Sequence, residues 1–427
     1  MKRYIALLLV FIILPSLISC GHTADITPES SHEVIETNKY EDFDNRFLPR
    51  SYSNAAFTYV DTEEVLYFNR KYLVKETGEC GYLCAKPDCT HKIGDDECGA
   101  YWVMGYYEGK LYCKGPEAGN YWGALYSEEL DGTDKELVYE YFGTADNCEA
   151  VKGHPFFHRG KLYYFYSNYT VVNAEPFTLF QIRRVVPNQP GFDLVLDEKV
   201  PYSERWHLYF KENFIYVLFD HSYRDEADEV QYVWELRRFD IDEETWEVVV
   251  TDDDAGGENR GFRITEDGEI WAVSWPYMDD DAVISDITED TVKLVDGHFV
   301  KQWQTQYTEE EGSPNSEISE GVIVTYYNKS NVRGNPDLLF RIRDYEGNLV
   351  SCGCFTPEEL REEHADFKFE SYELIWADEN ELWMQQHFQK LIIKEDGQTY
   401  EGLTMLVIYK ITENGFEKVF SEYDQLQ

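Results

Sequence analysis

The sequence predicts an all-β protein, a β-propeller of seven four-stranded blades, from two observations. Short strand-like segments recur at a nearly even spacing through the chain, and helical periodicity is almost absent. A propeller arranges such repeated sheets radially, so that only short, protected sheet edges remain. Six or eight blades are the alternatives, if the terminal strands pair differently. A parallel β-helix has shorter repeats, and two β-sandwiches would not repeat so evenly.

The repeat is seen in seven segments that align without gaps. They read EVLYF, GKLYC, GKLYYF, NFIYV, GEIWAV, GVIVTY and NELWM, and they begin at residues 64, 109, 160, 213, 268, 321 and 380. Their third positions are Leu66, Leu111, Leu162, Ile215, Ile270, Ile323 and Leu382, which lie 45, 51, 53, 55, 53 and 59 residues apart. Repeats of roughly 40 to 55 residues built from short strands are typical of propeller blades.

Each repeat has the same internal order of elements. A strand and a turn with Gly or Asn precede an aromatic-rich strand, and a polar loop and a more charged strand follow. Asp131-Gly132, Glu346-Gly347 and Asn414-Gly415 lie between β-branched and aromatic runs, where such pairs indicate hairpin turns. We therefore expect antiparallel strands joined by tight turns.

The first 22 residues, MKRYIALLLVFIILPSLISCGH, have the features of an export signal. Lys2 and Arg3 precede an apolar run over residues 4–17, which is too short for a dependable membrane span. Residues 17–20, Leu-Ile-Ser-Cys, resemble the lipobox of bacterial lipoproteins, which implies cleavage before Cys20 and a diacylglycerol on its thiol. An ordinary signal peptide with an accidental cysteine is the alternative.

These features divide the chain into three parts. We expect residues 1–19 to form a lipoprotein signal peptide and residues 20–50 to form an acylated cysteine with a flexible acidic tether. Residues 51–427 then form the propeller. The net charge of −44 disfavours nucleic acid and anionic lipid headgroups and favours cationic partners.

The signal, the lipobox, the acidic tether and the repeated GKLYY and LDGTDKELV units resemble a group of bacterial surface lipoproteins. These proteins have TolB-like or low-density-lipoprotein-receptor-like propeller bodies. The stretch LC-x-KP-x-C-x-H at residues 83–91 is also similar to theirs. The resemblance implies an extracytoplasmic protein that a lipid anchors to the bacterial cell membrane. No unit carries the YWTD tetrapeptide of the receptor propellers, so their ligand-binding modes are not implied.

One stretch carries a recognisable set of metal ligands. Cys84, Cys89, His91 and Cys98 offer three sulfurs and an imidazole, which is the ligand set of a closed structural zinc site. The spacing lacks paired C-x2-C knuckles, and Cys80 is a possible substitute ligand. The stretch is expected in the second half of the first repeat, where other repeats have their charged outer strand.

Outside the cytoplasm, disulfides compete with zinc for these residues. Eight cysteines remain besides Cys20, an even number that is compatible with disulfides. Cys352 and Cys354 are a possible reactive pair, a partner for the cysteine stretch, or two buried thiols. A disulfide staple, a structural zinc ion and a redox centre stay open for the stretch, in that order of preference. None of these roles is catalysis by zinc. A zinc ion held by four protein ligands has no open position for a substrate.

Linear motifs for catalysis are absent from the sequence. It contains neither the G-x-S-x-G nucleophile elbow nor the H-E-x-x-H zinc helix. Acidic runs at 252–254, 279–281 and 309–311 lack the spacing of a calcium loop and are expected to be solvated. Aromatic residues near predicted loops are candidates for ligand stacking, but we expect them to cover blade cores: Trp102, Tyr121, Trp122, Trp275, Tyr277 and Trp303.

Two functions follow from these observations. The main prediction is a surface-anchored propeller that binds a protein, peptide or glycan partner without catalysis. The alternative is an exported hydrolase or lyase that acts on glycans or peptides, with carboxylates and one of four histidines at the central channel. These histidines are His154, His158, His207 and His221. Carboxylates, a histidine and an arginine that converge on one channel mouth would favour the enzyme, whereas an aromatic rim would favour binding.

Overall fold

The structure is a computed structural model of the whole chain. It describes residues 59–86, 88–91, 98–115, 124–140, 154–172, 175–186, 192–201, 205–265, 267–275, 288–306, 313–328, 338–355, 365–394 and 397–425. The predicted signal peptide, Cys20 and the predicted tether lie outside these residues. Within them, no helix is long and apolar enough to cross a membrane.

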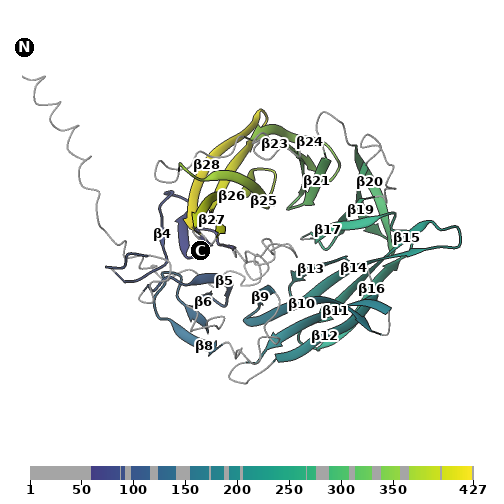
Figure 1. Cartoon of the computed structure of the whole chain (residues 1–427), viewed down its shortest axis with the longest axis horizontal. Coiled ribbons are helices and arrows are strands. Elements are labelled where there is room, and N and C mark those ends of the chain that lie inside the picture. The colour runs from purple at the N-terminus through teal and green to yellow at the C-terminus, as the bar shows by residue number, and fades with distance from the viewer. Residues whose placement is uncertain are drawn as a thin grey trace, which may run out of the picture.

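The described residues form seven four-stranded antiparallel sheets, arranged around a ring (Figure 1). Every sheet consists of four strands that are consecutive in the chain, so each sheet is one blade. The first strand of a blade lies toward the centre of the ring and the fourth lies at the rim. The prediction of a seven-bladed, all-β propeller is therefore confirmed.

The strands of the first four blades are as follows. Blade 1 contains β1 (Tyr59–Asp61), β2 (Val65–Phe68), β3 (Lys71–Val74) and β4 (Cys80–Tyr82). Blade 2 contains β5 (Trp102–Tyr107), β6 (Lys110–Lys114), β7 (Ala124–Glu128) and β8 (Glu136–Glu140). Blade 3 contains β9 (His154–His158), β10 (Lys161–Val172), β11 (Glu175–Val185) and β12 (Phe192–Pro201). Blade 4 contains β13 (Arg205–Lys211), β14 (Phe214–Arg224), β15 (Val230–Asp240) and β16 (Thr245–Asp252).

The remaining three blades continue in the same order. Blade 5 contains β17 (Glu258–Ile264), β18 (Ile270–Trp275), β19 (Thr288–Val295) and β20 (His298–Gln306). Blade 6 contains β21 (Ser313–Ile318), β22 (Val322–Asn328), β23 (Leu338–Asp344) and β24 (Leu349–Phe355). Blade 7 contains β25 (Lys368–Ala377), β26 (Glu381–Lys394), β27 (Gly397–Thr412) and β28 (Gly415–Gln425).

The seven aligned positions of the sequence repeat all fall on the second strand of a blade. Six of them are at most 1% exposed, and they are Leu66, Leu111, Leu162, Ile215, Ile323 and Leu382. The seventh, Ile270, begins β18 and is partly buried. The second strand is interior to its sheet, so an apolar residue there packs between neighbouring blades and recurs in each unit.

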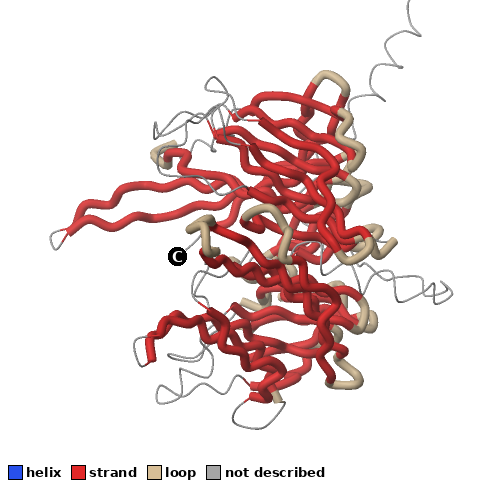
Figure 2. Tube along the Cα trace, turned by 90° about the vertical axis from the view of Figure 1, so that its right-hand side faces the viewer, coloured by secondary structure: helices blue, strands red, loops and turns tan. Residues whose placement is uncertain are grey.

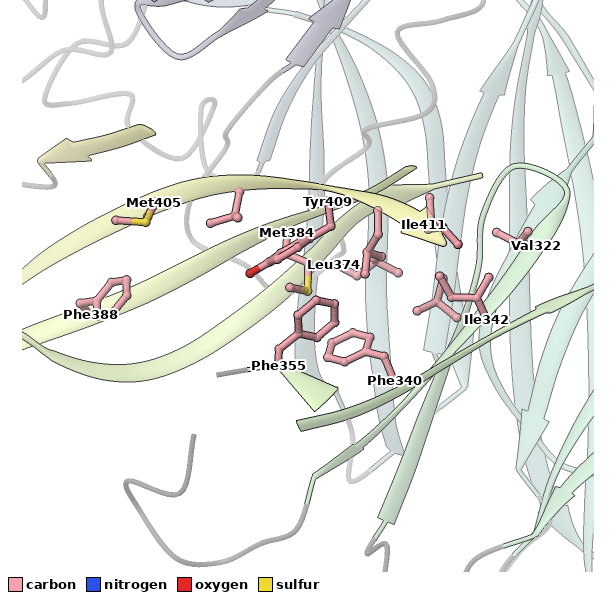
Figure 3. Packing of buried hydrophobic residues seen from close by; sticks show 14 of the residues in the cluster. Val322, Phe340, Ile342, Phe355, Leu374, Met384, Phe388, Met405, Tyr409 and Ile411 are labelled. Atoms are coloured by element: carbon pink, nitrogen blue, oxygen red, sulfur yellow. The ribbon is translucent and has the colours of Figure 1, made fainter. Parts of the chain in front are cut away.

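The core consists of side chains that pack between the faces of adjacent sheets. Between blades 6 and 7, Phe340 and Phe355 meet Tyr409 and Leu374, as Figure 3 shows. Between blades 3 and 4, the ring of Phe156 lies 4.4 Å from that of Phe210. The high aromatic content of the sequence therefore fills the seams between blades, as expected.

The ring closes between the last blade and the first. Tyr59, Leu66 and Phe68 of blade 1 share one buried cluster with Trp383 and Ile408 of blade 7. At the same seam, the Lys71 ammonium lies 3.2 Å from the Glu422 carboxylate, and Gln385 Nε2 donates to the Tyr59 hydroxyl. Closure therefore relies on side-chain packing, since each blade is complete in itself.

Long hairpins project from one side of the ring, as Figure 2 shows. In three blades the second and third strands have at least ten residues, and these pairs are β10–β11, β14–β15 and β26–β27. In blade 4, for example, the inner strand β13 begins at Arg205, which pairs with Asp220 of β14. Strand β14 continues to Arg224, so its end extends past the start of the inner strand. The projecting hairpins therefore rise on the face where inner strands begin.

Candidate functional site

A pocket of about 340 Å³ lies between blades 4 and 5 on the face with the projecting hairpins. Its lining comes from the end of β14, the start of β15 and the first residue of β17, and comprises Asp220, His221, Ser222, Tyr223, Arg224, Val230, Tyr232 and Glu258. Ligand pockets in proteins have volumes of roughly 300–1,000 Å³. The pocket is thus large enough for a small ligand, and its lining is mainly polar.

Asp220 is fixed at the inner wall of this pocket. It follows Leu218 and Phe219, which are buried in the sheet, and only 2% of its own surface is exposed. Its Oδ2 accepts a hydrogen bond of 2.8 Å from the backbone N–H of Asn259 in the next blade. This bond holds the carboxylate in one orientation and ties blade 4 to blade 5 at the pocket.

Glu258 provides the second carboxylate of the pocket from the start of β17. Its Oε2 lies 2.8 Å from the guanidinium of Arg260, and both side chains are a little over one quarter exposed. The Arg260 guanidinium in turn lies 3.9 Å from the centre of the Trp275 ring. The Arg260 side chain therefore sits between an acid and an aromatic face, which limits the positions open to Glu258.

A buried acid lies behind Trp275. Trp275 Nε1 donates a 2.6 Å hydrogen bond to Oε2 of Glu289, and the same oxygen accepts a 3.2 Å bond from the backbone N–H of Ser316. Glu289 is 1% exposed, and this burial raises its pKa above the ordinary value. Glu289 supports the tryptophan from the seam between blades 5 and 6.

The structure brings one of the four candidate histidines to the pocket, namely His221. His158 is almost fully buried on β9, where its Nε2–H donates a 2.9 Å bond to the Glu212 carbonyl. His207 is partly buried within β13, opposite Leu218. His154 begins β9, and its side chain is outside the described part of the structure. His158 and His207 are therefore parts of the blades.

The cysteine stretch folds into a compact cluster between blades 1 and 2. One ligand atom from each of Cys84, Cys89, His91 and Cys98 lies within 4.8 Å of the other three. The stretch follows β4, so it forms the connection to β5. It therefore does not occupy the position of the outer strand, where the repeat had placed it. Cys80 lies on β4 and packs against the blade 1–7 cluster, outside the set of four.

Hydrogen bonds and burial shape the electrostatics of this cluster. The backbone N–H of His91 donates to Cys89 Sγ, which lowers the pKa of that thiol. Burial raises the pKa of Cys98, and burial together with Arg70 lowers the pKa of His91. The His91 ring also stacks on Tyr82, with ring centres 4.6 Å apart and planes 13° from parallel.

The other cysteines are separate from this cluster. Cys352 and Cys354 lie on β24 of blade 6, two blades away around the ring, so they are no partners for it. Cys113 is buried, and its Sγ donates to Glu128 at 3.3 Å. No disulfide joins the cysteines that the structure describes, which are Cys80, Cys84, Cys89, Cys98, Cys113, Cys352 and Cys354.

The acidic and aromatic candidates have mixed outcomes. Asp252 is 1% exposed and accepts the backbone N–H of Phe299, so the expectation of a solvated carboxylate is wrong for this residue. Trp102 packs against the blade 1–7 cluster, and Trp303 lies beneath the Arg343 guanidinium. The runs at 279–281 and 309–311 and the residues Tyr121, Trp122 and Tyr277 lie outside the described residues.

Most of the pocket was not identified from the sequence. Asp220, Arg224 and Glu258 come from two blades, and no linear motif joins them. One signal was present: in FIYVLFDHSYR, Asp220 follows a run of apolar residues on the same strand. A charged side chain that extends an apolar strand run is unusual, because an acid is rarely buried without a partner.

No protein-family model matches the sequence, and no curated protein matches it. Solved structures are similar to it at low identity. YjhT has 8% identity and a TM-score of 0.33, with 62% of this chain and 84% of that chain covered. A GH93 α-L-arabinofuranosidase of Fusarium graminearum has 12% identity and a TM-score of 0.30, with coverage of 90% and 97%. A GH32 β-fructofuranosidase of Bombyx mori has 12% identity and a TM-score of 0.28, with coverage of 74% and 77%.

The main function prediction is corrected at this point. Similarities of this kind are too distant to carry an activity over to the chain. The pocket between blades 4 and 5 combines two carboxylates, a histidine and an arginine, which are the residue types named above for an enzyme. The prediction of a propeller that binds without catalysis is therefore wrong, and the alternative of a hydrolase is better supported.

Proposed function

We propose that this protein is an exported glycan hydrolase whose active site is the pocket between blades 4 and 5. The observation that carries the proposal is the convergence of Asp220, Glu258, His221 and Arg224 on one pocket of about 340 Å³. The range of possible reactions narrows because the pocket offers two carboxylates, whereas the sequence has no G-x-S-x-G nucleophile elbow. Paired acids are what hydrolysis of a glycosidic bond requires.

The two carboxyl groups divide the chemistry. Glycoside hydrolysis uses one carboxylic acid to protonate the leaving oxygen, and one carboxylate to attack the sugar or to activate water. Asp220, held by the Asn259 N–H, is the group with the fixed orientation that a nucleophile or base needs. Glu258 lies at the partly exposed side of the pocket and supplies the second carboxyl group.

The remaining lining suits a sugar. Tyr223 and Tyr232 lie on the two strands of the β14–β15 hairpin, and Tyr223 is exposed. Aromatic faces pack against sugar rings, while His221 and Arg224 supply hydrogen bonds to hydroxyl groups. A pocket with a mainly polar lining is better suited to a carbohydrate than to an apolar ligand.

The proposed location agrees with this substrate class. The export signal and lipobox at residues 1–20 support a protein that is anchored to the outside of a bacterial membrane through Cys20. Glycans of the cell surface and of the surroundings are accessible there. Cys20→Ala is expected to release the protein from the membrane fraction, as fractionation and immunoblotting would show.

The proposal is tested by hydrolysis assays on a panel of glycosides and oligosaccharides. Asp220→Asn and Glu258→Gln each remove one carboxylate with little change of shape, and each is expected to reduce kcat by at least about 100-fold. The melting temperature of Glu258→Gln should stay close to that of the unmodified protein, because the residue is partly exposed.

A matched control is available on the same hairpin. Glu229→Gln removes the same charge from an exposed residue that does not line the pocket, and its activity should be unchanged. Equal activity of the control and of both pocket variants would overturn the assignment of the site. Absence of hydrolysis across the whole panel, with a folded protein, would overturn the proposed function.

A further inference from the structure

We propose that Cys84, Cys89, His91 and Cys98 bind a zinc ion that fastens the first blade of the ring to the second. This site is independent of the pocket between blades 4 and 5, so the inference does not rest on the proposed hydrolase. A Cys₃His set is one of the usual ligand sets of structural zinc. Three lines of geometry support it.

The first line is the convergence of the four ligand atoms. Zinc bonds of about 2.0–2.3 Å in a tetrahedron keep ligand atoms roughly 3.3–3.8 Å apart. Cys98 Sγ and His91 Nδ1 are separated by 3.8 Å, and all four ligand atoms lie within 4.8 Å of one another. Small movements of the side chains would therefore complete a tetrahedron.

The second line is the set of donors around the sulfurs. Cys98 Sγ accepts hydrogen bonds from Arg70 Nη2 at 2.8 Å and from the Ala100 N–H at 3.4 Å. Cys89 Sγ accepts one from the His91 N–H at 3.4 Å. Donors of this kind stabilise thiolates, which are the form that binds metal. Three thiolates around Zn²⁺ leave one net negative charge, and the buried guanidinium of Arg70 balances it.

The third line is the position of the cluster in the fold. The strands of blade 1 have only three or four residues each, whereas those of blade 2 have five or six. Blade 1 therefore has few sheet hydrogen bonds of its own. The link around the cluster is anchored at both ends on the β2–β3 turn, by the bonds Leu83 N–H to Arg70 and Val103 N–H to Asn69. A metal there would strengthen the blade with the shortest strands.

A disulfide explains less of this arrangement. It would use two of the three sulfurs and would leave the third sulfur and the imidazole without a role. The imidazole is also held in place by its stacking on Tyr82. A catalytic metal is equally unsuited, because four protein ligands leave no position for water or substrate.

The experiment uses the full chain, purified without reductant or chelator. Metal content is measured by mass spectrometry, and the alkylation of each cysteine is mapped before and after chelation. We expect about one zinc ion per chain, protection of Cys84, Cys89 and Cys98 until a chelator is added, and a lower Tm after chelation. Apoprotein reloaded with Co²⁺ should show the absorption of a tetrahedral thiolate site.

Variants separate zinc binding from general effects on the fold. Cys89→Ser should abolish zinc binding, whereas Cys354→Ser, an exposed cysteine of blade 6, should retain it. Arg70→Lys should still fold and bind zinc, but should release it at about 10-fold lower chelator concentration. A metal-free protein with a disulfide between any two of the three cysteines would overturn the proposal, as would unchanged zinc content in Cys89→Ser.

Discussion

Single buried residues of this propeller respond to pH in ways that their surroundings dictate. His158 on β9 is 1% exposed and packs 5.1 Å from the Phe210 ring of the next blade. Burial lowers its pKa to about 4, because the imidazolium would lose its hydration, and the bond to the Glu212 carbonyl offsets only part of this. His158 is therefore neutral in the folded protein at neutral pH.

This burial predicts a loss of stability in mild acid. Above pH about 6.5, His158 is neutral in both the folded and the unfolded chain, so its protonation has no effect. As pH falls from about 6.5 to about 4, the unfolded chain binds a proton that the folded chain excludes, which costs up to about 3 kcal/mol.

His158→Gln removes the imidazole that titrates, but it keeps an N–H donor for the Glu212 carbonyl. The variant should be less stable than the unmodified protein at pH 7, because it loses ring packing against Phe210. The difference should shrink as pH falls toward 4.5. Denaturant unfolding at several pH values measures it, and two parallel curves of unfolding free energy against pH would contradict the assignment of this histidine.

At the scale of the strand, the start of β17 depends on a close approach of backbones within blade 5. Gly257 immediately precedes β17, and its carbonyl accepts a 2.9 Å hydrogen bond from Nε1 of the buried Trp234. A Cβ at this position would lie 2.1 Å from the Trp275 carbonyl oxygen. Glycine is therefore needed for β17 to lie where Glu258 reaches the pocket.

Gly257→Ala is expected to reduce the free energy of unfolding by about 2–3 kcal/mol, because the backbone must move to admit the methyl group. Activity at the proposed site should fall as well, since Glu258 is the next residue. Gly261→Ala, on the same strand, is the control: nothing lies within 4 Å of its Cβ. Thermal unfolding of both variants is the measurement, and equal destabilisation of the two would show that close approach at Gly257 is unimportant.

For the whole molecule, features that repeat or whose residues are close in sequence were predictable, whereas features assembled from different blades were not. The second strands were identified because an apolar residue such as Leu111 or Ile215 must be buried in every blade. The cysteine cluster was identified because its members are close in sequence. Asp220 and Glu258 meet only after two blades have packed, so no local pattern could reveal their proximity.

Closure of the ring makes the stability of the molecule depend on every blade. Blade 4 packs against both neighbours: Trp206 and Phe210 share a cluster with Phe156 of blade 3, while Trp234 shares one with Phe299 of blade 5. Removal of blade 4 would expose both of these apolar faces at once. Each Å² of exposed apolar surface costs roughly 25 cal/mol, whereas an ordinary domain is stable by only about 5–15 kcal/mol.

Deletion of residues 205–254, which contain β13 to β16, is therefore expected to abolish cooperative folding. Calorimetry of the shortened chain should show a broad transition or none, and the chain should aggregate, because the exposed faces of blades 3 and 5 are apolar. Glu229→Gln, a single exposed change within the deleted segment, controls for effects of the variant preparation. One sharp transition near the original temperature would mean that six blades close without the fourth, and would contradict the dependence of this ring on all seven.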